Sequence, residues 1–257
     1  MSNDRLIANP WTQLRRHTPA RIALGRAGPA WPTRETLDFG LAHARARDAV
    51  HHPLDAQALD AELRTAGYAP VHAHSAAAER TTYLTRPDLG RRLSDDSAQQ
   101  LCRLQGPAPI VVVAADGLSA VATQKHVALL LAELRTRSPQ RWASIPLVIA
   151  LQARVALGDE IGERLGAGLV VVMIGERPGL SSPDSLGLYV THAPRVGRTD
   201  AERNCISNVR PEGLSYVAAA RKLDWLVGAA MQRRLTGVGL KDESDAALPG
   251  DFPKLEN

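Results

Sequence analysis

Three short runs of consecutive apolar, largely β-branched residues constrain the fold of this chain more than any other feature. They span 110–115, 145–151 and 169–174. Runs of this length are typical of strands that are buried on both faces, as in a parallel sheet. Helices are expected over 119–137 and 157–165, and a fourth strand over 188–191. This alternation predicts an α/β fold, with a Rossmann-like parallel sheet covered by helices in right-handed βαβ order.

The segments that flank this region differ from it in character. Residues 1–32 contain four prolines and predict a basic, extended arm with one short helical piece. Residues 33–106 predict a small, mostly helical N-terminal subdomain. The α/β domain is expected over 107–240 and ends in a long helix. Residues 241–257 are acidic and predict a loose tail.

The charge of the chain is concentrated at its N-terminus. The 257 residues carry a net charge of +4, and residues 1–50 hold eight Arg against four acids, which accounts for the whole surplus. Aromatic residues make up only 4%, whereas nucleic-acid-binding domains typically combine a clustered basic surface with aromatics. We therefore expect no nucleic-acid partner.

Neither a membrane nor an oxidising compartment is expected. No apolar run approaches the length of a membrane helix, and the first residues lack the pattern of a secretory signal. The two cysteines, Cys102 and Cys205, cannot form a disulfide framework. A reducing, cytoplasmic location is the expectation.

Polar loops follow the four predicted strands, where ligands bind in a doubly wound sheet. They begin at Asp116, Gln152, Gly175 and Pro194. Gly117 and Ser119 either present backbone N–H groups to an anion or form an ordinary capped turn. Cys205 either lines a site or packs as a small hydrophobe.

No nucleotide-binding or catalytic signature accompanies these loops. The sequence lacks G-x-G-x-x-G, a P-loop, a G-x-S-x-G elbow and a metal-coordinating histidine in a D-x-H-x-x-G motif. It shows no compelling acid/base pair or set of metal ligands. We therefore predict a small-molecule-binding domain with no catalytic residue and no metal site of its own, which supplies part of an active site.

Several stretches, in the same order, resemble the small (light) subunit of ethanolamine ammonia-lyase. The most specific are GDEIGERLG at 158–166, GERPGLSSPDSLG at 175–187 and RNCISNVR at 203–210. Further matches lie at 20–28, 83–93, 115–120 and 235–241. The resemblance covers roughly residues 9–243. The glycines of the first stretch recur every four residues and also predict a helix face suited to close packing.

The resemblance implies an adenosylcobalamin enzyme that converts ethanolamine to acetaldehyde and ammonia by radical chemistry. The cofactor, with its own base on cobalt, would lie between this chain and a large subunit that binds ethanolamine. A hetero-oligomer with several copies of each chain is implied. The cobalamin contacts of the family correspond to Val155, Glu176 and Cys205. Position alone makes further candidates of Asp116, Gly117, Ser119, Arg177, Ser207 and Asn208.

The N-terminus departs from many members of that family. They begin with an additional helix and linker associated with a bacterial microcompartment, whereas the match here starts near Asn9. We therefore expect a freely cytoplasmic enzyme, with a microcompartment as the alternative. Residues 1–50 are expected to form an interface with the large subunit or with a neighbouring copy. Two other hypotheses remain at this stage: a self-sufficient α/β enzyme acting on a phosphorylated small molecule, and a non-catalytic assembly scaffold.

Overall fold

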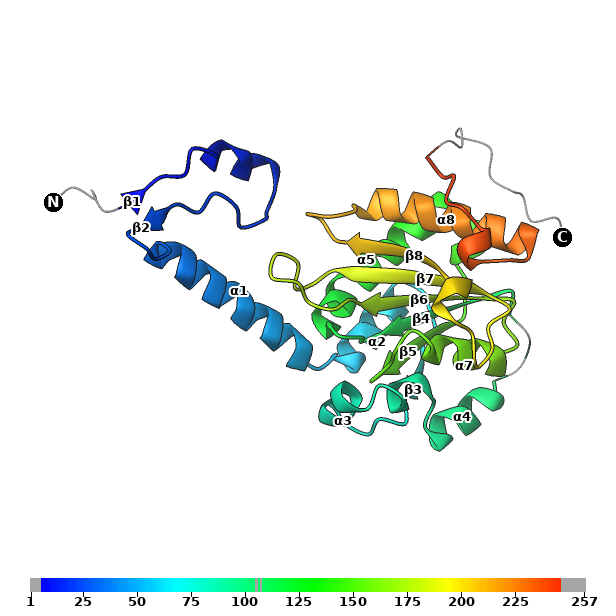
Figure 1. Ribbon diagram of the computed structural model, residues 1–257. Coiled ribbons are helices and arrows are strands. Elements are labelled where there is room, and N and C mark those ends of the chain that lie inside the picture. The colour runs from blue at the N-terminus through cyan, green and yellow to red at the C-terminus, as the bar shows by residue number, and fades with distance from the viewer. Residues whose placement is uncertain (1–5, 105, 107, 246–257) are drawn as a thin grey trace.

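The computed structural model describes residues 6–104, 106 and 108–245, and these form a central sheet with helices on both faces (Figure 1). The strand order is β3-β5-β4-β6-β7-β8. The parallel strands are β3 (Val71–His74), β5 (Leu147–Leu151), β4 (Ile110–Ala115) and β6 (Leu169–Gly175). The α/β fold predicted from the apolar runs is thus confirmed.

The last two strands differ from the predicted parallel arrangement. β7 (Leu186–His192) is antiparallel to β6, and β8 (Asn204–Val209) is antiparallel to β7. Only residues 176–185 connect β6 to β7, which is too short for the helical crossover that a parallel strand requires. The loop after β7 therefore lies at the opposite edge of the sheet from the ends of β4, β5 and β6. The end of β8 returns to the edge where those strands end.

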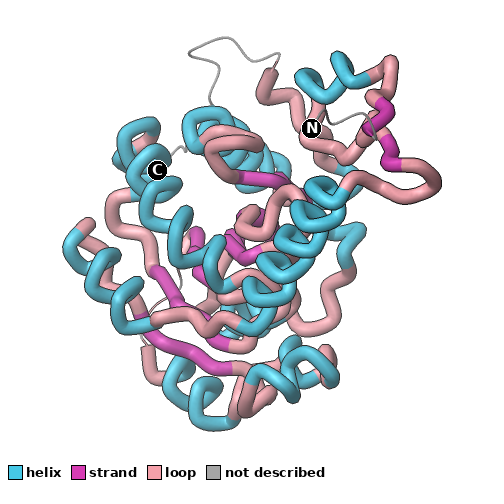
Figure 2. The backbone as a smooth tube through the Cα atoms, turned by 90° about the vertical axis from the view of Figure 1, so that its left-hand side faces the viewer, coloured by secondary structure: helices cyan, strands magenta, loops and turns pink. Residues whose placement is uncertain are grey.

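Two layers of helices bury the sheet (Figure 2). One face is covered by α2 (Ala56–Thr65), α5 (Ala120–Arg137), α6 (Pro139–Trp142) and α8 (Tyr216–Arg233). The other is covered by α4 (Asp95–Cys102) and α7 (Leu157–Arg164), and α3 (Arg80–Thr85) lies near the end of β5. Because successive residues of a strand point to opposite faces, Val112 joins the first core and Val113 the second.

Glycines allow α7 to approach the sheet closely. A Cβ atom on Gly158 would lie 2.3 Å from Cγ2 of Val172, and one on Gly162 would lie 2.5 Å from Cγ of Pro194. Gly166 is different, because it lies beyond the end of α7 with φ +61°. It ends the helix, as glycine commonly does in the left-handed region.

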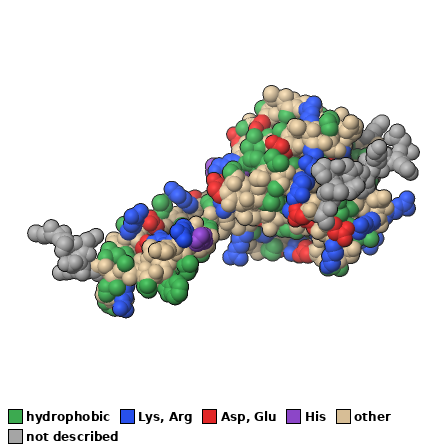
Figure 3. All heavy atoms as spheres, turned by 90° about the horizontal axis from the view of Figure 1, so that it is seen from above, with side chains coloured by type: hydrophobic (Ala, Val, Ile, Leu, Met, Phe, Trp, Pro, Cys, Tyr) green, Lys and Arg blue, Asp and Glu red, His purple; other side chains and the backbone are tan. Residues whose placement is uncertain are grey.

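The N-terminal arm, which in the structure includes the helix that follows residue 32, projects away from the α/β body (Figures 1 and 3). It contains β1 (Leu6–Ile7), the 3-10 helix η1 (Thr12–His17), β2 (Arg26–Ala27) and α1 (Thr33–His51). Along α1, which is described throughout, Ala49 is the one buried residue. Trp11, Trp31 and Leu37 are 66%, 60% and 67% exposed. The arm therefore presents apolar surface that the described part of this chain does not cover.

The C-terminal segment packs back onto α8 as far as it is described. Leu240 is buried, Lys222 Nζ lies 3.1 Å from an oxygen of Asp242, and both Arg221 and Lys222 pair with Asp245. The prediction of a loose tail over 241–257 falls outside the described residues from 246 onward. Within the described ranges, no helix is long and apolar enough to span a bilayer.

Candidate functional site

Asp116, at the end of β4, bonds to the backbone of the protein itself. Its buried carboxylate accepts hydrogen bonds from the N–H groups of Gly117, Gln152 and Ala153 at 2.9, 2.8 and 2.9 Å. Arg80 Nη1 lies 3.7 Å away. Burial raises the pKa of Asp116, and the three N–H donors and Arg80 oppose that rise. The carboxylate thus joins the loops that follow β4 and β5.

Gly117 and Ser119 also have partners within the chain. Gly117 has φ +58°, and a Cβ atom there would lie 2.2 Å from the carbonyl oxygen of Gly175. The hydroxyl of Ser119 donates to the carbonyl of Pro183 at 2.8 Å. These contacts favour a structural turn over an anion site. The turn ties the start of α5 to the β6–β7 connection.

An open surface lies on β7 and β8, beside α7. On this face of the two strands Gly187, Tyr189, Cys205 and Ser207 alternate with residues such as Leu188 and Ile206, which point into the core under α8. Tyr189 is half-buried, and Cys205 and Ser207 are exposed. Among the described residues, no helix covers them. We call these four residues the open face.

Glu176 extends from the end of β6 across the open face. Its Oε2 accepts a hydrogen bond from the backbone N–H of Asn208 at 3.2 Å. A Cβ atom on Gly187 would lie 3.0 Å from both Cγ and Oε1 of Glu176, so the glycine makes room for this side chain. Within the described part of the chain, Oε1 accepts no hydrogen bond. One carboxylate oxygen therefore remains available to a ligand.

Tyr189 lies between Glu176 and Cys205. It is opposite Cys205 in the strand pair, and the two side chains interact. Partial burial raises the pKa of both groups, and the charge of Glu176 raises them further. Cys205 is thus a neutral thiol at neutral pH, suited to packing rather than to nucleophilic attack. Sequence reasoning missed Tyr189, because its position opposite Cys205 requires β8, a strand that no apolar run indicates.

Val155 lines a cavity of about 710 Å³ beside the start of α7. The remaining lining comes from the turn around the 3-10 helix η2 (Leu89–Arg91) and from the β7–β8 connection. Val155 and Tyr189 also pack against the same hydrophobic core cluster. The cavity that holds Val155 therefore adjoins the surface that holds Glu176 and Cys205.

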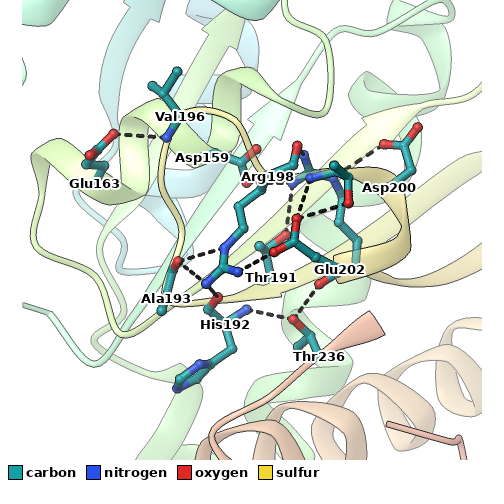
Figure 4. A network of polar contacts seen from close by, with 12 residues as sticks. Asp159, Glu163, Thr191, His192, Ala193, Val196, Arg198, Asp200, Glu202 and Thr236 are labelled. Atoms are coloured by element: carbon teal, nitrogen blue, oxygen red, sulfur yellow. Dashed lines mark hydrogen bonds and ion pairs between the residues drawn. The ribbon is translucent and has the colours of Figure 1, made fainter. Parts of the chain in front are cut away.

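Two arginines hold the β7–β8 connection, which forms one wall of the cavity (Figure 4). Buried Arg203 donates to the buried carboxylate of Asp159 at 2.5 Å. Arg198 donates to the carbonyls of His192 and Ala193 and pairs with Glu202. Hydrogen bonds from Thr199 and Arg198 lower the pKa of Glu202 to about 2. The wall is thus cross-linked by charged hydrogen bonds.

The remaining candidates lie around Glu176. Asn208 has φ +59°, and its side-chain oxygen accepts from Arg210 Nε at 3.0 Å, while its N–H bonds to Glu176. Arg177 and Ser207 are exposed, and no described acidic group pairs with Arg177. The described residues contain no group of three or more His, Cys, Asp or Glu side chains placed to hold a metal ion.

Comparison with known proteins decides the family. Residues 8–241 match the family model described as ethanolamine ammonia-lyase light chain (EutC). The chain belongs to the ethanolamine ammonia-lyase light chain family. It is similar to proteins named ethanolamine ammonia-lyase small subunit: 57% identical to that of Pseudomonas fluorescens (strain Pf0-1), over 92% of this chain and 88% of the relative. It is also 57% identical to those of Ralstonia nicotianae (93% and 91% covered) and Azotobacter vinelandii (95% and 95%). The resemblance seen in the ethanolamine ammonia-lyase motifs is confirmed.

Proposed function

We propose that this chain is the cofactor-binding light subunit of an adenosylcobalamin-dependent ethanolamine ammonia-lyase. The complex converts ethanolamine to acetaldehyde and ammonia, and the large subunit binds ethanolamine. Bound adenosylcobalamin supplies the radical chemistry. The role of this chain is to bind and orient the base-on cofactor at the interface with the large subunit.

The observation that carries the proposal is the open face and the carboxylate that crosses it. Corrin rings carry peripheral amide groups, which are hydrogen-bond donors, and Oε1 of Glu176 is an acceptor without a described partner. The Gly187 position leaves room for Glu176 to lie flat against the sheet. A surface that is uncovered, partly apolar and rimmed by such an acceptor fits one side of a large, flat ligand.

Cys205 and Val155 contribute packing. The neutral thiol of Cys205 offers a soft, polarizable contact on the open face, and half-buried Val155 offers an apolar one in the adjoining cavity. Both residues belong to segments that are anchored from behind, by Ile206 in the core and by Ala153 bonded to Asp116. Anchored contacts of this kind bind a ligand with little loss of conformational entropy.

The N-terminal arm supports a second part of the proposal, namely that residues 1–50 form an interface with the large subunit. Trp11, Trp31 and Leu37 are more than half exposed. Exposed apolar patches of this kind commonly mark interaction sites. Arginines interspersed along the arm suit acidic groups on the rim of such an interface.

The test is the cobalamin affinity of the complex of this chain with its large subunit, with Glu176→Gln as the variant. We expect the affinity to fall by about tenfold, which corresponds to one hydrogen bond to a charged group. Glu62→Gln, at an exposed position on α2, is the matched control and should leave the affinity unchanged. An unchanged affinity in Glu176→Gln would remove Glu176 from the site. A wild-type complex that assembles but binds no cobalamin would refute the proposed function.

A further inference from the structure

Arginines dominate the described lining of the cavity beside α7. The lining contains Arg91, Arg92, Arg154, Arg198 and Arg203, with Asp88 and Asp200 as its acidic members. Most cavities of this size bind ligands mainly through apolar surface and a few polar groups. A lining so rich in guanidinium groups favours an anionic ligand.

Several of these positive charges are neutralised within the chain. Arg203 pairs with Asp159 and Arg198 with Glu202. Arg92 lies 3.7 Å from a carboxylate oxygen of Glu160, which also binds Arg164 at 2.9 Å. Asp88, the acid on the same turn, is paired with Arg86 at 2.7 Å.

Two arginines of the cavity have no carboxylate partner among the described residues. Arg91 is exposed, and its side chain makes no described hydrogen bond or ion pair. The side chain of Arg154 donates only to the carbonyl of Tyr83, and its buried Nε has no hydrogen-bond partner in the described part of the chain. The uncompensated positive charge of the cavity therefore lies at these two residues, with Arg92 beside them.

The Arg154 side chain is held in one orientation. Its guanidinium carbon lies 4.3 Å from the centroid of the Tyr83 ring, and Nη2 donates to the carbonyl of Tyr83 at 3.1 Å. Gly90 packs against the aliphatic part of the Arg154 side chain, since a Cβ atom on Gly90 would lie 3.0 Å from Cγ of Arg154. The backbone N–H of Arg154 donates to the carbonyl of Gly90 at 2.8 Å. A guanidinium fixed in this way loses little freedom when it binds an anion.

We propose that Arg91 and Arg154, assisted by Arg92, bind a phosphodiester, and that this phosphodiester is the one in the nucleotide tail of cobalamin. The inference rests on the proposed function. Two observations join the cavity to the cofactor surface: Val155 lines the cavity next to Arg154, and Val155 packs against the same core cluster as Tyr189 of the open face. The guanidinium fork matches the oxygens of a phosphate in geometry and in charge. In this arrangement the corrin ring lies toward Glu176 and the tail enters the cavity.

The experiment compares two ligands on the complex of this chain with its large subunit. Cyanocobalamin carries the nucleotide and its phosphodiester, whereas dicyanocobinamide has the same corrin ring without them. We expect Arg91→Gln and Arg154→Gln each to weaken cyanocobalamin binding by about tenfold or more. Dicyanocobinamide binding should change by less than about twofold, because it lacks the group that these residues bind. Arg103→Gln, an exposed position just beyond the end of α4 and outside this cavity, is the control and should affect neither ligand.

Inorganic phosphate distinguishes the two sources of the anion. Phosphate that weakens cyanocobalamin binding to the wild type, but not to Arg91→Gln, supports the proposal. Alternatively, phosphate binding could depend on Arg91 while the variants keep the wild-type preference for cyanocobalamin over dicyanocobinamide. That result would assign the site to free phosphate and overturn the cofactor tail as its ligand.

Other outcomes separate this inference from the proposed function. Equal losses for both ligands, or no loss for either, would overturn the phosphodiester site while leaving cobalamin binding by the complex intact. A wild-type complex that binds neither ligand would refute the proposed function itself. Because the Arg91 side chain is exposed and has no described partner, Arg91→Gln keeps the test decisive if Arg154→Gln reduces folding.

Discussion

The carboxylate of Asp116 provides the sharpest test of how the site is held in place. Substitution by Asn keeps the shape of the side chain and replaces one oxygen with an NH2 group. Oδ1 accepts from Gly117 and Ala153, both at 2.9 Å, and Oδ2 accepts from Gln152 at 2.8 Å. If Asn retains Oδ1, its NH2 group faces the N–H of Gln152, so that two donors oppose each other. Arg80 also loses the carboxylate 3.7 Å away.

The cost of this change follows from the partners that are lost. A hydrogen bond to a charged group contributes about 1.5–3 kcal/mol, and breaking a buried ion pair typically costs about 3–5 kcal/mol in total. We therefore expect Asp116→Asn to lower the free energy of unfolding by about 3–5 kcal/mol, a large part of the roughly 5–15 kcal/mol of a typical domain. For a chain of this size the corresponding fall in Tm is roughly 6–20 °C.

Thermal unfolding of the purified chain, followed by circular dichroism, measures this effect. Asp38→Asn is the matched control, because Asp38 is exposed on α1 and lies 3.9 Å from Arg34 in a solvated pair. It should shift Tm by less than about 2 °C. A shift as small in Asp116→Asn would refute the reasoning, since it would mean that the buried carboxyl is already neutral or that its three N–H contacts do not stabilise the fold.

Three further predictions concern the elements around the site. Burial lowers the pKa of His126, whose ring contacts Tyr216 and the Asp184 carbonyl. The stability that neutral His126 contributes is therefore lost as the pH falls from 6.5 through the lowered pKa of the folded state. His126→Asn should flatten the decline of Tm between about pH 7.5 and 5. Parallel declines in the variant and the wild type would contradict this prediction. Gly158→Ala places a methyl group 2.3 Å from Val172, so calorimetry should show a loss of about 1–3 kcal/mol, and an unchanged Tm would refute the close packing of α7. Trp31→Ser should leave the Tm of the isolated chain unchanged but weaken its association with the large subunit in analytical ultracentrifugation, and intact association would remove Trp31 from the interface.

The buried strands and their helices could be predicted from the sequence because their signals are local. The run 110–115 is apolar at every position, and β4 is buried along its whole length. The side chain of Asp55 accepts from the N–H of Ala58 at the start of α2, and Asp at such a position is a typical helix-start signal. Such features depend on residues a few positions apart, so periodicity and capping rules detect them.

β8 and the direction of β7 could not be predicted in the same way. In β8 only Ile206 and Val209 are buried, and the polar residues between them are typical of a loop. The antiparallel direction of β7 depends on the length of the connection from β6 rather than on the residues of the strand. This error placed the 194–198 loop at the wrong edge of the sheet.

The candidate site was predicted in part. The positions of the strand ends directed attention to the polar loops that follow them. However, Asp116 and Ser119 bond to backbone groups far away in the sequence, which no local pattern reveals. Position after a strand also could not distinguish Glu176 from Asp116. Glu176 keeps one carboxylate oxygen available, whereas both carboxylate oxygens of Asp116 accept hydrogen bonds within the chain. The pairing of Tyr189 with Cys205 needed the sheet register.

Reconstitution tests the central claim, that this chain is the cofactor-binding half of a two-subunit lyase, most directly. This chain alone, the large subunit alone and the co-expressed pair would each receive adenosylcobalamin and ethanolamine, with acetaldehyde followed by a coupled dehydrogenase. Acetaldehyde should form only with the pair and only with the cofactor, and the paired complex containing Glu176→Gln should require more cofactor for half-maximal activity. Activity of this chain alone, or activity of the pair without adenosylcobalamin, would contradict the account.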